Sequence, residues 1–325
     1  MEIIKVFKSK NYINHPIYGK IYFPYYDKQH KFLPNIPEVY KKDTNGNFIK
    51  QDVFFLRDNY FPYCPYVYSN YFIFDRYNFG LDTHFYTHEA MLETMGAPKR
   101  RFGLFVESES IVPKSFQIFK KNKNLYKEFN AIFTFSDHIL DSVPNAKFYP
   151  YCAGVWYNDP CILNLNLQER LSLKSKNVSI VSSNKKFCDL HRFRIDVANM
   201  CLNENLADTF GTFRDGSSYV NINDTLTKYR FSIAIENDAT SYFFTEKITN
   251  CFASLTIPIY LGAKAIGKFF NKDGIIQINT ESDLKKILSK CTPEFYNERL
   301  DAILDNYNRV QEYKNIWDYL YKHYL

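Results

Sequence analysis

The stretch that decides the fold is residues 231–262, which read FSIAIENDATSYFFTEKITNCFASLTIPIYLG. It opens with a short apolar run, passes through a polar loop into Thr245-Glu246-Lys247, and ends in a second apolar run closed by Gly262. Short apolar runs predict buried strands, and Thr245 before a helical pattern is a typical N-cap. The stretch therefore predicts a strand, a loop, a helix and a strand, which together form one unit of a parallel α/β sheet.

The same alternation extends to both sides of this unit. It predicts an α/β chain with two Rossmann-like domains and a C-terminal helical tail, at residues 1–160, 161–300 and 301–325. Residues 293–325 are predicted to form a long helix that braces the fold. The other predicted strands cover residues 101–106, 131–135 and 177–181, and the other predicted helices cover residues 115–126 and 189–201.

The composition excludes several classes of protein. Hydrophobic residues make up 46% of the chain and charged residues 23%, which argues against disorder. The formal net charge of +6 is not gathered into a basic run, so a nucleic-acid-binding protein is not expected. Seven cysteines without a C-x-x-C pair indicate reduced thiols and no zinc site. The sequence lacks an apolar run of membrane-spanning length or a signal-peptide core, so we expect a cytoplasmic protein without a membrane anchor.

Polar residues lie where a ligand of an open α/β sheet is expected. Such ligands bind at the carboxyl ends of the strands, and Glu236-Asn237 follows the strand at 231–235. The helix start at Thr245 offers free N–H groups to a phosphate, and Lys247 adds a full positive charge. Glu246 can accept hydrogen bonds from sugar hydroxyls.

The stretch from Phe231 to Ala263 closely resembles the donor-binding signature of the α-1,3-fucosyltransferases, family 10 of the glycosyltransferases. That signature has an apolar strand, E-N, a short loop, Y-x-T-E-K, a helix, and an apolar strand with an internal proline that ends in glycine. Order, spacing and Pro258 agree. One position departs: where the family has tyrosine this chain has Phe243, with Tyr242 beside it. Either Tyr242 makes the hydroxyl contact or the contact is lost.

Two further stretches resemble elements of the same family. Ser183 and Asn184, followed by an arginine on a helix, resemble its S-N…R element, whose arginine meets the donor diphosphate. Arg192 is the preferred match, and Arg194 remains open because the loop is slightly longer here. The stretch LFVESESIVP, residues 104–113, resembles E-S-x-S-x-x-P and places the family's catalytic glutamate on Glu107, with Glu109 as the alternative.

The resemblance implies a glycosyltransferase B architecture, with an acceptor-side domain first and a nucleotide-sugar donor domain second. It implies an inverting transfer of L-fucose from GDP-fucose to a sugar hydroxyl of a glycan. No cofactor or metal is expected, because the sequence has no D-x-D and the cations can stabilise the leaving diphosphate. The alternatives are another GDP-sugar donor or a non-catalytic nucleotide-sugar-binding protein. The implied donor-binding residues are Ser183, Asn184, Arg192, Arg194, Asn237, Tyr242, Thr245, Glu246 and Lys247.

The motif HFYTHE, residues 84–89, is the remaining candidate for a metal site. His84 and His88 stand four residues apart and could share one side of a helix. The motif is not H-E-x-x-H, however, so we assign it no metal.

Overall fold

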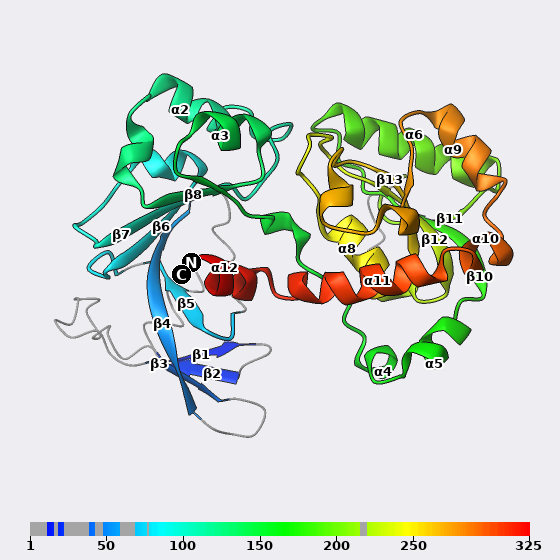
Figure 1. Cartoon of the computed structure of the whole chain (residues 1–325), viewed down its shortest axis with the longest axis horizontal. Coiled ribbons are helices and arrows are strands. Elements are labelled where there is room, and N and C mark those ends of the chain that lie inside the picture. The colour runs from blue at the N-terminus through cyan, green and yellow to red at the C-terminus, as the bar shows by residue number, and fades with distance from the viewer. Residues whose placement is uncertain are drawn as a thin grey trace.

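The computed structural model describes residues 12–15, 19–22, 39–42, 48–58, 69–76, 78–214 and 220–325. These residues form two α/β halves that lie side by side, each built around a largely parallel sheet (Figure 1). A separate antiparallel pair is formed by β1 (Tyr12–His15) and β2 (Gly19–Tyr22). The expected α/β fold with two Rossmann-like halves is confirmed.

The sheet of the first half has the strand order β3-β4-β6-β7-β8-β9, and β5 also pairs with β4. All its strand pairs are parallel except β3 with β4. Every residue of β5, β6 and β8 is buried, as expected for a parallel sheet that is covered on both faces. The strands are β3 (Val39–Lys42), β4 (Phe48–Arg57), β5 (Phe72–Asp75), β6 (Thr83–Thr87), β7 (Arg100–Leu104), β8 (Ala131–Thr134) and β9 (Ala146–Phe148).

The sheet of the second half is fully parallel and has the strand order β11-β10-β12-β13-β14. This order creates a topological switch point between β10 and β12, where ligands of such sheets bind. The strands are β10 (Lys176–Val181), β11 (Asp208–Phe210), β12 (Tyr229–Ile235), β13 (Ile257–Leu261) and β14 (Ile276–Gln277). The helices of this half before the tail are α4 (Pro160–Leu163), α5 (Leu167–Ser172), α6 (Asp189–Asn203), α7 (Ile222–Leu226), α8 (Glu246–Ala253) and α9 (Glu281–Leu288).

The predicted strands and the helices of the second half are confirmed within about two residues at each end, as β7, β8, β10, β12, β13, α6 and α8. The predicted helix at 115–126 is wrong in its length. It is broken into a 3-10 turn (Ser115–Gln117), α2 (Ile118–Lys121) and a second 3-10 turn (Leu125–Glu128). The break occurs because the side chain of Asn122 bonds back to the carbonyl of Ile118, 3.0 Å away, and ends the helix.

The long helix predicted at 293–325 is also broken. It consists of α10 (Pro293–Asn297), α11 (Leu300–Val310), a 3-10 turn (Gln311–Tyr313) and α12 (Ile316–Tyr324). Asn315 has an extended backbone and caps α12 by accepting from the N–H groups of Trp317 and Asp318, so a new helix starts there.

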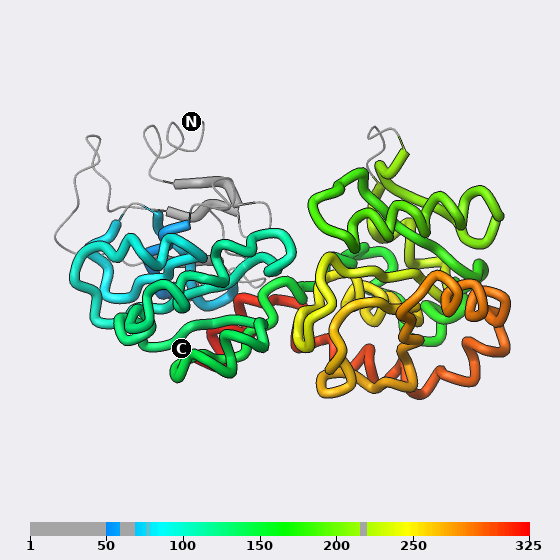
Figure 2. Tube along the Cα trace, turned by 90° about the horizontal axis from the view of Figure 1, so that it is seen from above, coloured from blue at the N-terminus to red at the C-terminus, as the bar shows by residue number. Residues whose placement is uncertain are grey.

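The tail links the two halves. Figure 1 shows α11 running along the second half and α12 lying under the first. The hydroxyl of Tyr149 donates to the carbonyl of Ile316 at 3.0 Å, and Ser69 donates to Asp318 at 2.9 Å. The tail therefore packs against both halves, as expected. Figure 2 shows from above how it passes from the second half to the first.

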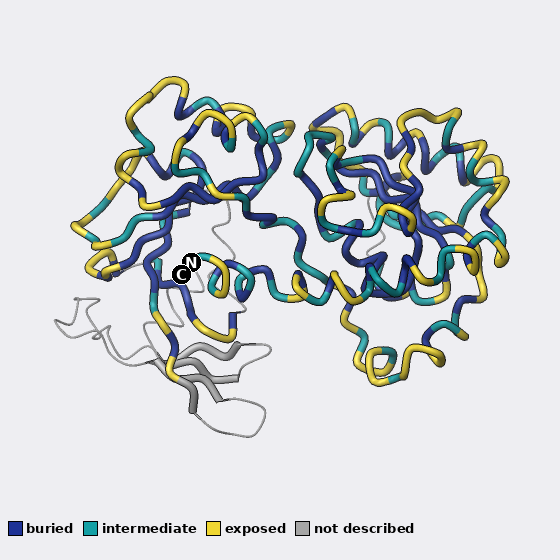
Figure 3. The backbone as a smooth tube through the Cα atoms, viewed as in Figure 1, coloured by how far each residue is buried: buried dark blue, intermediate teal, exposed yellow. Residues whose placement is uncertain are grey.

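Aromatic side chains supply much of the first core. The rings of Phe74, Phe85, Phe102 and Phe133 follow one another across the sheet with centroid separations of 5.2, 5.0 and 5.5 Å. Figure 3 shows the central strands of both sheets as buried. In the described residues, the high aromatic content is therefore explained mainly by packing.

The described cysteines, Cys152, Cys161, Cys188, Cys201, Cys251 and Cys291, are all free thiols. Within the described ranges, no helix combines the length and the apolar character needed to cross a bilayer.

Lys174 is a buried cation next to the second sheet. Its ammonium group donates to the carbonyl of Leu226 at 3.0 Å and to Thr256 Oγ1 at 2.8 Å. Burial lowers the pKa of Lys174 well below its usual value, and no carboxylate in the described residues forms an ion pair with it. Folding therefore favours the neutral amine at this position.

We expect Lys174→Met to make the free energy of unfolding less dependent on pH. The unfolded chain protonates Lys174 below a pKa of about 10.4, whereas the folded chain binds that proton only at lower pH. Between these two pKa values, acidification destabilises the wild type by up to about 1.4 kcal/mol per pH unit, and the variant lacks this slope. Urea unfolding from about pH 9 down to about pH 7 measures the difference.

Lys176→Met is the matched control, because the Lys176 side chain is 52% exposed and pairs with Asp208 at the surface. The control should keep the wild-type slope. A Lys174→Met slope equal to that of the control would show that Lys174 is charged in the fold.

Candidate active site

The carboxyl edges of the two sheets meet at one place. The loop after β12 contacts the first half at several points: Asn237 Nδ2 donates to Glu107 Oε1 at 3.3 Å, and Asp238 Oδ2 accepts from Ser110 N at 3.1 Å and Ser110 Oγ at 2.8 Å. Ser241 N also donates to Asp137 Oδ2 at 3.1 Å, at the start of α3 (Asp137–Ser142). The ends of β7, β12 and their loops therefore form one site.

Glu236, directly after β12, is the buried centre of this site. Its carboxylate is fully inaccessible and accepts from Thr245 N at 2.9 Å and Thr245 Oγ1 at 2.7 Å. Tyr260 donates to it from the next strand at 3.5 Å. A side chain at Gly262 would meet Tyr260 Oη at 2.3 Å and Glu236 Cγ at 2.5 Å, so only glycine permits this close approach.

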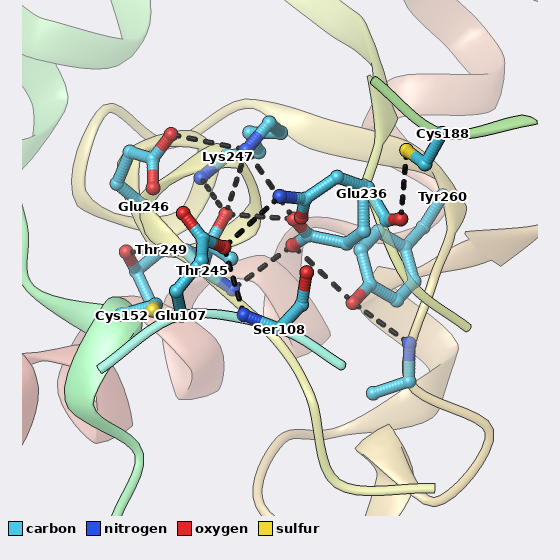
Figure 4. Close-up of polar contacts among 12 residues, drawn as sticks. Glu107, Ser108, Cys152, Cys188, Glu236, Thr245, Glu246, Lys247, Thr249 and Tyr260 are labelled. Atoms are coloured by element: carbon cyan, nitrogen blue, oxygen red, sulfur yellow. Dashed lines mark hydrogen bonds and ion pairs between the residues drawn. The ribbon is translucent and has the colours of Figure 1, made fainter. Parts of the chain in front are cut away.

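Lys247 joins the cluster from the first turn of α8. Its Nζ lies 3.5 Å from Glu236 Oε2, 3.1 Å from Glu246 Oε1 and 3.1 Å from Thr245 Oγ1 (Figure 4). Burial alone lowers the pKa of Lys247, but Glu246 and Glu236 outweigh it and raise the pKa above the usual value. Lys247 is therefore a fixed positive charge at the mouth of the site.

The predicted helix start is confirmed. Thr245 is the N-cap of α8, and its Oγ1 accepts from Lys247 N at 3.2 Å. The side chain of Thr245 thus serves two functions at once, since it caps the helix and also donates to Glu236.

Arg192 and Arg194 point to different environments. Arg192 has a side chain that is 53% exposed and bonds to Asp189 Oδ1 at 2.5 Å and to the carbonyl of Lys186 at 2.8 Å. Arg194 is only 7% exposed, and among the described residues its guanidinium forms no hydrogen bond or ion pair. Burial lowers the pKa of Arg194, and the nearby carboxylates Glu236 and Glu246 oppose that shift. Arg194 is therefore the arginine that belongs to the cluster.

His191 was not found by sequence reasoning. It lies in the first turn of α6, is buried, and its Nδ1 has no hydrogen-bond partner in the described residues. Burial lowers the pKa of His191 to about 4, with smaller contributions from Arg194, Lys247 and Lys185. The histidine is thus neutral and surrounded by positive charge, an environment that suits an anion.

Ser183 and Asn184 lie in the loop after β10, on the other side of the switch point. Asn184 N donates to Thr212 Oγ1 at 3.4 Å, and Lys185 N donates to Ser183 Oγ at 3.5 Å. These bonds hold the loop against the turn at Gly211, which has a φ of 98°. Ser183 and Asn184 lie at the carboxyl edge of the second sheet, and their hydrogen bonds stay within this loop region.

Tyr242, which lies beside the departing Phe243, has its hydroxyl bonded outside the Glu236 cluster. Tyr242 accepts a hydrogen bond from Lys268 Nζ at 3.0 Å, and its ring packs near Phe148. Phe243 is buried and packs on Phe135 of the first half, with ring centroids 4.9 Å apart. Phe243 therefore helps to join the halves, and the Tyr242 hydroxyl is bonded outside the Glu236 cluster.

Glu107 and Glu109 differ in their surroundings. Both are partly buried, but Glu107 Oε1 accepts from Ser108 N at 2.8 Å and from Asn237 Nδ2, which belongs to the second half. Burial, and to a lesser extent the charges of Glu107 and Glu246, raise the pKa of the Cys152 thiol. The carboxylates of Glu107 and Glu246 therefore both lie near this thiol. Figure 4 shows Glu107 together with the Thr245 and Lys247 cluster, so Glu107 faces the shared site.

The two histidines of HFYTHE do not share a helix, so that expectation is wrong. His84 lies in β6, where its Nδ1 is 2.8 Å from the hydroxyl of Tyr86, and His88 follows the strand in a 3-10 turn, His88–Leu92. The structure groups no three His, Cys, Asp or Glu side chains for a metal ion in the residues it describes.

The chain resembles known glycosyltransferases in sequence and in fold. Residues 171–315 match the sequence model of the family described as Glycosyltransferase family 10 (fucosyltransferase) C-term. The chain is also 29% identical over 93 residues to the Alpha-(1,3)-fucosyltransferase FucT of Helicobacter pylori. That match covers 28% of this chain and 20% of the length of the relative.

Solved structures resemble the chain over a larger share. An α1,3-fucosyltransferase crystal structure with GDP-fucose is 17% identical, and 75% of this chain and 79% of that one are covered at a TM-score of 0.43. A second α1,3-fucosyltransferase structure is 20% identical, with 79% and 80% covered at a TM-score of 0.46. A trehalose 6-phosphate synthase from Burkholderia multivorans is 10% identical, with 74% and 70% covered at 0.46. These sequence identities and TM-scores are too low to assign the role of a residue in those proteins to a residue of this chain.

Proposed function

We propose that the chain is an inverting fucosyltransferase, because residues 171–315 match the sequence model of the C-terminal part of glycosyltransferase family 10. It moves L-fucose from GDP-fucose to a hydroxyl of a glycan, in the α-1,3 linkage that the resemblance implies. The observation that carries this proposal is the site geometry: Lys247 and Arg194 lie at the switch point of the donor sheet, and Glu107 reaches the same site from the other sheet.

The donor diphosphate binds between α6 and α8, where the positive charges of Arg194 and Lys247 lie. Lys247 is held in place by Glu236 and Glu246, and Arg194 is buried nearby without a partner of its own in the described residues. An anion between these two helices would give the guanidinium of Arg194 the charged hydrogen bonds it lacks. We therefore assign the diphosphate contact to Arg194 instead of Arg192, which is already bonded to Asp189.

The leaving group is stabilised without a metal. As the bond between the fucose carbon and the diphosphate oxygen breaks, negative charge develops on the β-phosphate. Lys247, Arg194 and the positive end of the α8 dipole stabilise this charge, so the proposed mechanism requires no divalent cation. Ser183, Asn184, Asn237 and Glu246 line the same edge and hold the donor.

Glu107 is the proposed general base. It removes the proton of the acceptor hydroxyl while that oxygen attacks the anomeric carbon of fucose from the face opposite GDP, which inverts the configuration. The hydrogen bond from Asn237, on the loop that follows Glu236, couples the base to the donor loop. Glu109 has no such link in the described residues.

The donor identity is tested by a panel of nucleotide sugars. We expect GDP-fucose to support transfer, and GDP to raise the melting temperature, with UDP much weaker. A ligand at 100 times its Kd adds about 2.7 kcal/mol to the free energy of unfolding, which a thermal shift detects. Activity should also survive EDTA. Equal stabilisation by UDP would overturn the GDP assignment, and loss of turnover on chelation with recovery on adding magnesium would overturn the metal-free mechanism.

Arg194→Ala should weaken GDP binding more than Arg192→Ala does. Removing a charge-assisted contact costs about 1.5–3 kcal/mol, or roughly 10- to 150-fold in Kd. Arg192→Ala is the matched control, because it removes the same side chain from the same helix at an exposed position. Isothermal titration with GDP gives both values, and the opposite ranking would return the contact to Arg192.

Glu107→Gln should lower the rate of transfer by about 10²–10⁴-fold and leave the Kd for GDP unchanged, because a general base acts on the acceptor. Glu109→Gln should be much milder. Initial rates under donor saturation and GDP titrations of both variants make the comparison. A larger loss in Glu109→Gln would move the base there, and full turnover in both variants would remove this loop from the chemistry.

A further inference from the structure

His88 occupies a strained position at the end of β6. Its φ is 48°, in the left-handed region that residues other than glycine seldom adopt, and its side chain is buried with the residue 1% exposed. Strain of this kind costs roughly 1–3 kcal/mol and persists only where the surrounding structure enforces it. The position therefore needs an explanation in what the side chain holds.

The His88 ring holds the backbone that leads to Glu107. The last bond on the β8 side is from Phe105 N to the carbonyl of Phe133, at 2.9 Å. The next N–H, that of Val106, donates to His88 Nε2 at 3.0 Å, so the histidine takes the place of a strand partner. Val106 directly precedes Glu107, and the direction of the chain at the candidate base is set by this bond.

The ring is held in the state that can accept this bond. Burial lowers the pKa of His88 to about 4, so the imidazole is neutral near pH 7. Because Val106 N donates to Nε2, that nitrogen holds the lone pair of the neutral ring. Its orientation is fixed by edge contacts with Phe105 and Phe116, whose ring centroids lie 5.4 and 6.2 Å away. His88 Nε2 is thus a neutral, oriented hydrogen-bond acceptor for the backbone that leads into the loop after β7.

The next residue holds the other end of the same loop. Glu89 Oε2 accepts from the hydroxyl of buried Ser115 at 2.7 Å, and Asp238 of the second half holds Ser110 between them. The loop from Phe105 to Ser115 is thus fixed near its start, its middle and its end. Two of these three contacts come from consecutive residues, His88 and Glu89.

We propose that His88 is a positioning residue for the transfer reaction, which through Val106 N fixes the backbone that presents Glu107 to the acceptor hydroxyl. This rests on the proposed function, in which Glu107 is the base. Catalytic groups displaced by about 1 Å can lose about 10²-fold in rate, so loss of this bond should appear in kcat. Arg194 and Lys247 belong to the other half, so donor binding should be unaffected.

The test compares His88→Phe with His88→Gln. Phenylalanine keeps the ring contacts and removes the acceptor, whereas the glutamine oxygen can reach Val106 N. We expect His88→Phe to lower kcat roughly 10- to 100-fold with the KM for GDP-fucose and the Kd for GDP unchanged, and His88→Gln to recover most of the loss. His84→Phe is the matched control, because it replaces another buried histidine of the same region that does not contact the loop, and it should keep the wild-type kcat.

A double-mutant cycle separates positioning from general damage. If His88 acts through Glu107, His88→Phe should slow the Glu107→Gln enzyme only slightly. The same fold-loss in both backgrounds, or an equal loss in His88→Gln and His88→Phe, would overturn the proposal. Full activity of Glu107→Gln would instead overturn the choice of base. If His88→Phe does not fold, His88→Asn tolerates the left-handed backbone but is too short to reach Val106, and the same outcomes apply.

Discussion

The site is organised by a carboxylate that has no contact with water. A buried charge must be satisfied by protein groups, and Glu236 is satisfied by the N–H and hydroxyl of Thr245, the hydroxyl of Tyr260 and the ammonium group of Lys247. These partners come from β12, the start of α8 and β13, so a single side chain fixes the spacing of three consecutive elements. Burial raises the pKa of Glu236, and the charge of Lys247 opposes that rise. The Lys247 charge is thereby held at a defined point of the sheet edge.

The second constraint is the attachment of the two halves to each other. The loop after β12 bonds to the loop after β7 through Asn237 and Asp238, while α12 crosses back to pack under the first sheet. Phe243, two residues before Thr245, packs against Phe135 of the first half. Groups of both halves are consequently part of one hydrogen-bonded unit, so a displacement of the loop after β12 also displaces Asn237, the partner of Glu107.

The strain at His88 fits this arrangement. An isolated left-handed histidine is unfavourable, but the bond to Val106 N satisfies a buried N–H that no strand partner reaches, and leaving such a group unpaired costs about 1–3 kcal/mol. The two costs are of similar size, so the fold can retain the strain. As a result, the direction of the backbone after β7 is fixed at Val106, the residue before Glu107.

The sequence by itself determined the elements of the second half, because their apolar periods and the Thr245 cap are local signals, and it placed Thr245, Glu246 and Lys247 at a helix start. It could not determine where the helices at 115–126 and 293–325 break, since Asn122 and Asn315 act through bonds to particular backbone groups. It also left Arg192 and Arg194 unresolved, because two residues of spacing on a helix change the face, and only packing decides which face is buried. His88 and His191 carried no usable signal, since their roles depend on groups that folding brings from other strands and helices.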